Sequence, residues 1–295
     1  MSRLYEALRK SEIENRQSGV AAATEIARPA PGELAAPIGS VAELDVAKTV
    51  PLRVSPESHL VALTEHQGLP AEKFRVLVTR LENLRARQEI KSLQVTSSII
   101  DEGKTLVAVN LSVTLARQSA NRVLLIEGDL HNPSLHAILG LSHLKGISHW
   151  WKDPTSTMSD FLYHIDGLPL WYLPAGERHE EPAGILQSSR MAESLSQLTA
   201  LFDWVIVDST PLSPMADANI WNRLTDGMLL VVREGVTPVK ALKRGLAGLD
   251  GPKIVGVVLN GASESDRVNY YDKRYGAPPN SKNGGTAEKA LETND

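Results

Sequence analysis

The stretch with the clearest chemical meaning runs from Ser98 to Thr105 and reads Ser-Ile-Ile-Asp-Glu-Gly-Lys-Thr. It ends in the Gly-Lys-Thr of a phosphate-binding loop, although Ser98 stands where such loops begin with glycine. Backbone N–H groups of such a loop surround phosphates at a helix N-terminus, while the lysine contacts the outer phosphates and the hydroxyl ligates Mg²⁺. The sequence therefore predicts a nucleotide site. Its predicted binding residues are Ser98, Asp101, Glu102, Gly103, Lys104, Thr105 and Leu106.

Acidic residues follow two further apolar runs of the chain. Glu127 and Asp129 come directly after one run, and Asp208 ends another. In open parallel sheets ligands bind beyond the carboxyl ends of the strands, so these carboxylates are expected to converge on the loop. Together with Thr105 they suit a metal, and the predicted Mg²⁺ ligands are Thr105, Asp129 and Asp208. For Glu127 an alternative stays open, in which it only caps the next helix.

The elements that must position these residues alternate along the chain from residue 92 onward. Consecutive apolar positions indicate strands covered on both faces, which alternate with amphipathic helices. This pattern predicts an α/β fold, a doubly wound and mostly parallel sheet of the P-loop NTPase type with helices on both faces. The expected strands are 92–97, 122–127, 169–173, 204–208, 228–233 and 254–260, and the expected helices are 71–87, 105–118, 188–202 and 238–249.

The two ends of the chain differ in composition from this core. Residues 1–18 predict a short N-terminal helix, and residues 19–57, rich in Ala and Pro, predict a flexible linker. The P-loop domain is expected to span 58–262. Residues 263–295 are polar and Gly/Asn/Ser-rich, which predicts a disordered tail that contains tyrosines.

Composition excludes several functional classes. The 295 residues carry 31 Lys+Arg against 35 Asp+Glu, a net charge of −4, which argues against a nucleic-acid partner. The absence of cysteine excludes disulfide scaffolds, zinc–thiolate sites and cysteine nucleophiles. No apolar run approaches the ~20 residues that span a bilayer, and the N-terminus lacks a secretory signal, so a cytoplasmic protein is expected.

Residues 58–262 contain a combination of short motifs, each of which is unspecific alone. The segments are Thr96-Ser97-Ser98, Glu102–Thr105, Val123–Asp129, Leu130, Pro133, His136, Leu173–Gly176, Leu186, Ser188, Arg190-Met191, Phe202-Asp203, Asp208, Pro211, Asp217 and Gly256–Asn260. In this combination the chain resembles the bacterial tyrosine-kinase (BY-kinase) family of exopolysaccharide and capsule systems, relatives of the ParA/MinD-type ATPases.

The resemblance implies a reaction in which a tyrosine hydroxyl attacks the γ-phosphate of ATP bound with Mg²⁺. Lys104 and Thr105 would hold phosphate and metal, Asp208 would place Mg²⁺ and Asp129 would assist. Glu127 stands where the family has an aspartate that accepts the tyrosine proton, and Asn260 where relatives hydrogen-bond the base. The implied catalytic residues are Lys104, Glu127, Asp129 and Asp208, and the implied phosphoacceptors are Tyr270, Tyr271 and Tyr275.

The resemblance also implies partners and a role. Family members form rings of subunits, so a homo-oligomer is expected. The chain would regulate exopolysaccharide or capsule polymerisation and export. A transmembrane polysaccharide co-polymerase, which controls chain length, would recruit it to the inner face of the plasma membrane.

Several positions depart from the family pattern. Asp101 replaces a glycine of the loop, where it places a negative charge beside the phosphates and a Cβ where φ is positive. Glu127 replaces aspartate and moves the carboxylate by a methylene. In the ring helix, Glu72 and Arg75 match the Glu-x-x-Arg-x-x-Arg motif, but Val78 stands at the second arginine.

Two alternatives to an active kinase therefore remain. One is a catalytically weak or inactive nucleotide-binding scaffold of the polysaccharide machinery, which the changes at Asp101, Glu127 and Val78 favour. The other is a ParA/MinD-like ATPase, although Ile99 occupies the position of the second lysine that this class requires.

Overall fold

The computed structural model describes residue 44 and residues 47–55, 58–65, 68–119, 121–142, 144–213, 216–251 and 253–262. The predicted N-terminal helix (1–18), the tail (263–295) and its three tyrosines lie outside the described residues.

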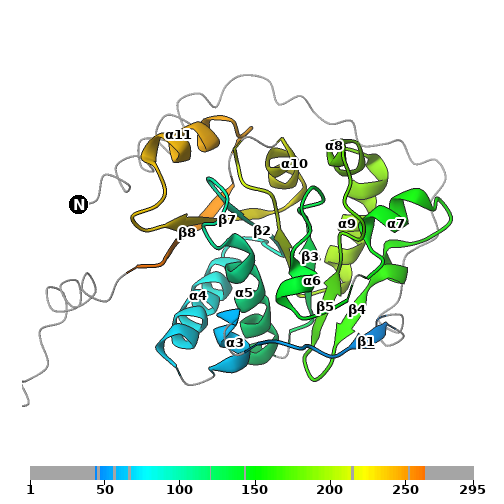
Figure 1. The fold of residues 1–295 in the computed structure, drawn as a ribbon, viewed down its shortest axis with the longest axis horizontal. Helices are drawn as coiled ribbons and strands as arrows, with labels where there is room; N and C mark the ends of the chain where they lie inside the picture. The colour runs from blue at the N-terminus through cyan, green and yellow to red at the C-terminus, as the bar shows by residue number, and fades with distance from the viewer. Residues whose placement is uncertain are drawn as a thin grey trace, which may run out of the picture. The chain divides into compact units, whose positions relative to one another are not determined.

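An eight-stranded sheet with the order β1-β4-β5-β3-β6-β2-β7-β8 forms the centre of the fold (Figure 1). Neighbouring strands are parallel throughout, except for the antiparallel pair β4–β5. The six expected strands are confirmed to within one residue at each end. They are β2 (Ser92–Ser97), β3 (Val123–Glu127), β5 (Leu170–Leu173), β6 (Trp204–Asp208), β7 (Gly227–Arg233) and β8 (Ile254–Asn260).

Two strands were not predicted from the sequence, β1 (Lys48–Val50) and β4 (Tyr163–Ile165). Each has three residues, too few to show a period, and they pair with each other next to β5. Because β1 lies within 19–57, that stretch is not a flexible linker throughout. Pairing with β4 holds this part of it, and such tertiary pairing cannot be read from composition.

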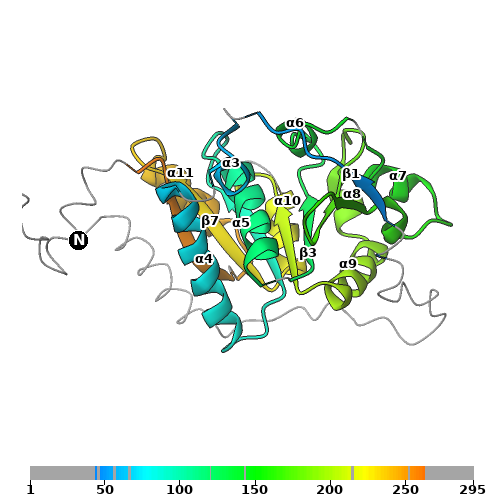
Figure 2. The ribbon, with the colours of Figure 1, turned by 90° about the horizontal axis from the view of Figure 1, so that it is seen from below.

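Helices cover both faces of the sheet, which confirms the doubly wound α/β fold. Figure 1 shows α4 and α5 on one side of the strands and α10 and α11 on the other, and Figure 2 views the protein from the side of α4 and α5. The helices are α3 (Val61–Thr64), α4 (Leu69–Arg85), α5 (Lys104–Ser119), α6 (Leu135–Ile138), α7 (Ile147–Lys152), the 3₁₀ helix η2 (Met158–Phe161), α8 (Pro182–Leu186), α9 (Ser189–Leu201), α10 (Asp217–Leu224) and α11 (Val239–Ala247).

Alternation along the strands divides the core into two layers. In β3, Val123 and Leu125 pack into the cluster with α4 and α5, whereas Leu124 and Ile126 join the cluster with α9 and α10. All four side chains are 0–1% exposed. Because a strand turns successive side chains to opposite faces, a continuous apolar run is what a sheet covered on both sides requires.

The strand order brings three chain segments to one edge of the sheet. β6 lies between β3 and β2, and Glu127 at the end of β3 pairs in register with Asp208 at the end of β6. β2 runs parallel to β6 and leads into the loop 98–103, which α5 follows. The loop and the strand-end carboxylates therefore share the carboxyl edge of the sheet, as the sequence predicted.

None of the helices within the described ranges combines the length and apolarity needed to cross a membrane.

Candidate active site

The loop between β2 and α5 contains two residues in the left-handed region of backbone conformation. Asp101 and Gly103 have positive φ angles, of 61° and 91°. A Cβ at Gly103 would lie 2.2 Å from Nδ2 of Asn260, so both the conformation and the close approach require glycine there. Asn260 itself donates this amide to the carbonyl of Glu102, at 2.9 Å.

Glu102 holds the loop from inside. Its side chain is fully buried and accepts a hydrogen bond from the Ile99 N–H at 2.9 Å. It also accepts a hydrogen bond from the hydroxyl of Thr237, which lies in the segment after β7. Arg233, at the end of β7, donates to the carbonyl of Asp101 at 3.0 Å. Residues at and after the ends of β7 and β8 thus hold the loop through hydrogen bonds, although they are distant from it in the sequence. Neither Thr237 nor Arg233 belongs to a motif, so neither was predicted from the sequence.

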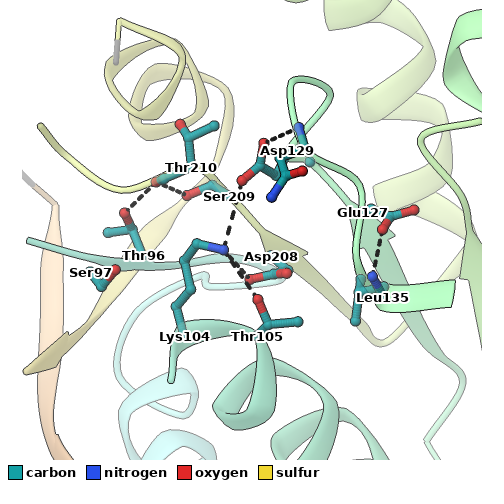
Figure 3. Close-up of polar contacts among 12 residues, drawn as sticks. Thr96, Ser97, Lys104, Thr105, Glu127, Asp129, Leu135, Asp208, Ser209 and Thr210 are labelled. Atoms are coloured by element: carbon teal, nitrogen blue, oxygen red, sulfur yellow. Dashed lines mark hydrogen bonds and ion pairs between the residues drawn. The ribbon is translucent and has the colours of Figure 1, made fainter. Parts of the chain in front are cut away.

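Lys104 points from the first turn of α5 towards two carboxylates (Figure 3). Its Nζ lies 3.7 Å from Oδ1 of Asp208, 3.8 Å from Oδ2 of Asp129 and 3.1 Å from the Thr105 hydroxyl. The lysine side chain is 15% exposed. The structure thus brings together the four residues that the sequence assigned to phosphate and metal.

Asp208 is the most deeply buried of these groups, at 1% exposed. Burial raises the pKa of its carboxyl to about 6, a rise that Lys104 and the Thr105 hydroxyl oppose and that Asp129 and Glu127 increase. Its Oδ1 accepts no hydrogen bond from the described residues. A buried carboxylate oxygen without a hydrogen-bond donor is stabilised by a cation, and Lys104 at 3.7 Å is the cation nearest to it among the described residues.

The donor set at this edge suits Mg²⁺. The Thr105 hydroxyl and the carboxylates of Asp129 and Asp208 are hard oxygen ligands, and proteins bind this ion through one or two carboxylates plus substrate phosphates. Within the described part of the chain, no group of three or more His, Cys, Asp or Glu side chains is placed to hold a metal alone. The oxygens of Thr105, Asp129 and Asp208 therefore fit an Mg²⁺ ion whose other ligands are phosphate oxygens.

The segment that carries Asp129 is tied to its neighbours. The Gly128 N–H donates to the carbonyl of Asp208 at 2.8 Å, and the Trp221 indole of α10 donates to the Gly128 carbonyl at 3.0 Å. Oδ1 of Asp129 accepts the N–H of Asn132 at 3.0 Å, which leaves Oδ2 towards Lys104.

A contact between a histidine and a carboxylate joins the same segment to α10. Nε2 of His131 lies 3.3 Å from Oδ2 of Asp217, whose residue is 3% exposed. Burial raises the pKa of Asp217, Asp129 raises it further and His131 opposes the rise. Asp217 is one of the residues that match the family motifs, but its contact with His131 could be seen only in the structure.

Glu127 is not part of the Lys104 cluster. Figure 3 shows it pointing away from Lys104 towards Leu135, whose N–H it accepts at 2.7 Å. Its other oxygen accepts the Tyr172 hydroxyl at 2.9 Å and the Ala175 N–H at 3.1 Å. Burial of the Tyr172 hydroxyl raises its pKa well above the usual value, and the neighbouring Glu127 carboxylate raises it further. The alternative prediction, that Glu127 caps the next helix, is confirmed, because Glu127 accepts the N–H of Leu135, the first residue of α6.

The remaining predicted residues have different surroundings. Ser98 is fully buried, and its hydroxyl has no hydrogen-bond partner among the described residues. The side chain of Asp101 is exposed, whereas Leu106 packs against the core. Val78, at the second arginine position of the ring motif, is 1% exposed inside the core cluster with α5, so it presents no cation to a neighbouring subunit.

No family model matches the sequence. The chain is 30% identical over 216 residues to the tyrosine-protein kinase YwqD of Bacillus subtilis, which covers 72% of this chain and 90% of that protein. It is 32% identical over 220 residues to the succinoglycan biosynthesis transport protein ExoP of Rhizobium meliloti, which covers 70% of this chain and 28% of that protein.

Two solved structures share the fold. The kinase domain of the Escherichia coli tyrosine kinase ETK matches with a TM-score of 0.65 at 25% identity, over 79% of this chain and 84% of that one. The chimerical protein CapA2B2 matches with a TM-score of 0.64 at 25% identity, over 74% of this chain and 95% of that one.

Proposed function

The chain belongs to the family of bacterial tyrosine-protein kinases, and from that premise we propose that it is an ATP- and Mg²⁺-dependent protein-tyrosine autokinase of exopolysaccharide or capsule synthesis. One observation carries the proposal. Lys104, the lysine of a Gly-Lys-Thr loop, lies between the carboxylates of Asp129 and Asp208 at the edge where a P-loop domain binds its nucleotide.

The chain's own residues divide the work of phosphate transfer. Backbone N–H groups of the loop and of the first turn of α5 bind the phosphates of ATP. Lys104 turns from the two carboxylates to the outer phosphates, where it stabilises the charge that develops in transfer. Thr105 and Asp208 would hold Mg²⁺, and Asp129 would assist directly or through water. The ion, when bound, neutralises phosphate charge. Asn260, whose amide donates to the Glu102 carbonyl, would hydrogen-bond the base, as its position does in relatives.

The acceptors in this proposal are Tyr270, Tyr271 and Tyr275, which lie outside the described residues. They would be phosphorylated in trans within a homo-oligomer. A transmembrane polysaccharide co-polymerase would activate the chain and bring it to the inner face of the membrane. The support is the family membership, together with a relative named for succinoglycan biosynthesis transport.

The position of Glu127 favours a second candidate function. The family places a proton-accepting aspartate there, but this carboxylate accepts three hydrogen bonds away from Lys104. A chain without that base would still bind nucleotide through the loop. It would then act as a nucleotide-binding scaffold of the polysaccharide machinery.

Mass spectrometry of the full chain, incubated with Mg·ATP and its membrane partner, tests the proposal. Phosphate is expected on the tail tyrosines of the wild type and of Lys240→Ala, a matched exposed lysine on α11, and none on Lys104→Ala. ADP binding without phosphate on any tyrosine would favour the scaffold. Absence of both would refute the nucleotide site.

A further inference from the structure

The carboxylate of Glu127 ends β3 two residues before Asp129 and is 2% exposed. Both of its oxygens are used. One accepts the Leu135 N–H, and the other accepts the Tyr172 hydroxyl and the Ala175 N–H. Three donors from two segments, the start of α6 and the end of β5, stabilise this buried carboxylate.

These contacts close the turn that carries Asp129. Glu127 stands before Gly128 and bonds to Leu135, so the side chain joins the two ends of the turn 128–134. Its bonds to Tyr172 in β5 and to Ala175 after β5 fix the turn against the next strand. Asp129 lies inside this closed turn and reaches Lys104 from it.

We propose that Glu127 is a positioning residue, which fixes the turn of Asp129 so that this carboxylate stays aimed at Lys104 and the metal. In this role Glu127 acts through Asp129 and does not itself take the tyrosine proton, because both of its oxygens already accept hydrogen bonds on the side away from Lys104. The inference rests on the proposed function in that it assigns a role within that site.

The extra methylene of glutamate makes this role possible. An aspartate carboxylate would end about 1.5 Å closer to the backbone. It could not keep all three hydrogen bonds at 2.7–3.1 Å without moving the turn. The departure from the family's aspartate is therefore coupled to a change of role at this position.

Glu127→Gln is the first test, because glutamine has the same side-chain shape as glutamate. One carboxylate oxygen becomes an amide N–H donor, which then faces a backbone N–H donor and cannot accept its hydrogen bond. The Mg²⁺ concentration for half-maximal ADP binding, measured by calorimetry, should rise about tenfold, as is typical for the loss of a group that orients a metal ligand. Amide hydrogen exchange of residues 128–135 should become faster, while that of β2 stays unchanged. The KM for Mg·ATP should rise more than kcat falls.

Tyr172→Phe is the second test and removes one donor to Glu127 without touching the Lys104 cluster. It should shift the Mg²⁺ requirement in the same direction by about threefold. Tyr163→Phe is the matched control, because Tyr163 is the residue opposite Tyr172 in the β4–β5 pair and bonds the backbone of Lys145 instead. It should leave the Mg²⁺ requirement unchanged.

Two outcomes would overturn the inference. One is a Glu127→Gln variant with a kcat lowered by a hundredfold or more but with unchanged Mg²⁺ titration and unchanged exchange at 128–135, which is the signature of a lost base. The other is equal behaviour of Tyr172→Phe and Tyr163→Phe, which decides the matter even if Glu127→Gln does not fold. Because ADP binding and exchange need no phosphate transfer, they test Glu127 even if the wild type leaves its tail unphosphorylated.

Discussion

Replacement of Asp208 with asparagine should stabilise the ligand-free protein while it removes Mg²⁺-dependent nucleotide binding. Burial raises the pKa of Asp208 to about 6, against about 3.9 for an ordinary aspartate. The folded state therefore holds this proton more tightly than the unfolded chain does, and it loses stability as the pH rises from about 4 to 6. A pKa difference of about 2 corresponds to about 3 kcal/mol. Asparagine cannot ionise, so it avoids this loss.

The net gain at pH 7.5 should be about 3 kcal/mol, because the pKa of about 6 already includes the attraction of Lys104 for the ionised carboxylate. Urea unfolding between pH 4.5 and 8 measures it. The free energies of unfolding of wild type and Asp208→Asn should diverge as the pH rises. Asp250→Asn, whose side chain is 72% exposed, should follow the wild type within about 0.5 kcal/mol. Parallel curves for wild type and Asp208→Asn, or a variant that is less stable at pH 7.5, would refute the reasoning.

Three further substitutions test the loop. Gly103→Ala should lose ADP binding and about 2 kcal/mol of stability, because the φ of Gly103 is 91° and a Cβ would lie 2.2 Å from the Asn260 amide. Gly184→Ala is the control in urea unfolding, since nothing lies within 4 Å of its added Cβ. Asp101→Gly should bind ADP several-fold more tightly in calorimetry and gain about 1 kcal/mol, since it removes a charge and a left-handed non-glycine residue. Asp101→Asn separates the two effects, because only the charge is lost; equal affinity of all three proteins would contradict both. Thr237→Val removes the hydroxyl that donates to Glu102, and it should cost about 1–3 kcal/mol and weaken ADP binding; unchanged affinity and unfolding would show that this contact does not support the loop.

Most of the fold could be predicted from the sequence, because strands such as β3, β6 and β7 are apolar runs and the helices between them are amphipathic. The strands β1 and β4 could not, since three residues show no period and only their pairing stabilises them. The same limit explains why part of the 19–57 stretch is a strand. Its partner, β4, follows it by more than a hundred residues.

The site divides in the same way. Lys104, Asp129 and Asp208 were predicted to meet because a parallel sheet brings the carboxyl ends of its strands to one edge. The contacts of Thr237 and Arg233 with the loop could not be predicted, because they depend on where β7 ends. The direction in which the Glu127 side chain points could not be predicted either. The last residue of a strand can point to either side of the following turn, and the Tyr172 hydroxyl that bonds Glu127 comes from another strand.

Calorimetric titration of the full chain with ADP, with and without Mg²⁺, tests most directly whether Lys104 and the two strand-end carboxylates form a nucleotide site. The wild type should bind ADP with a measurable heat that strengthens when Mg²⁺ is added, and Lys104→Ala should show no such heat at the same concentrations. A folded wild-type protein that releases no heat with either titrant, or a Lys104→Ala variant that binds as tightly as the wild type, would contradict the account.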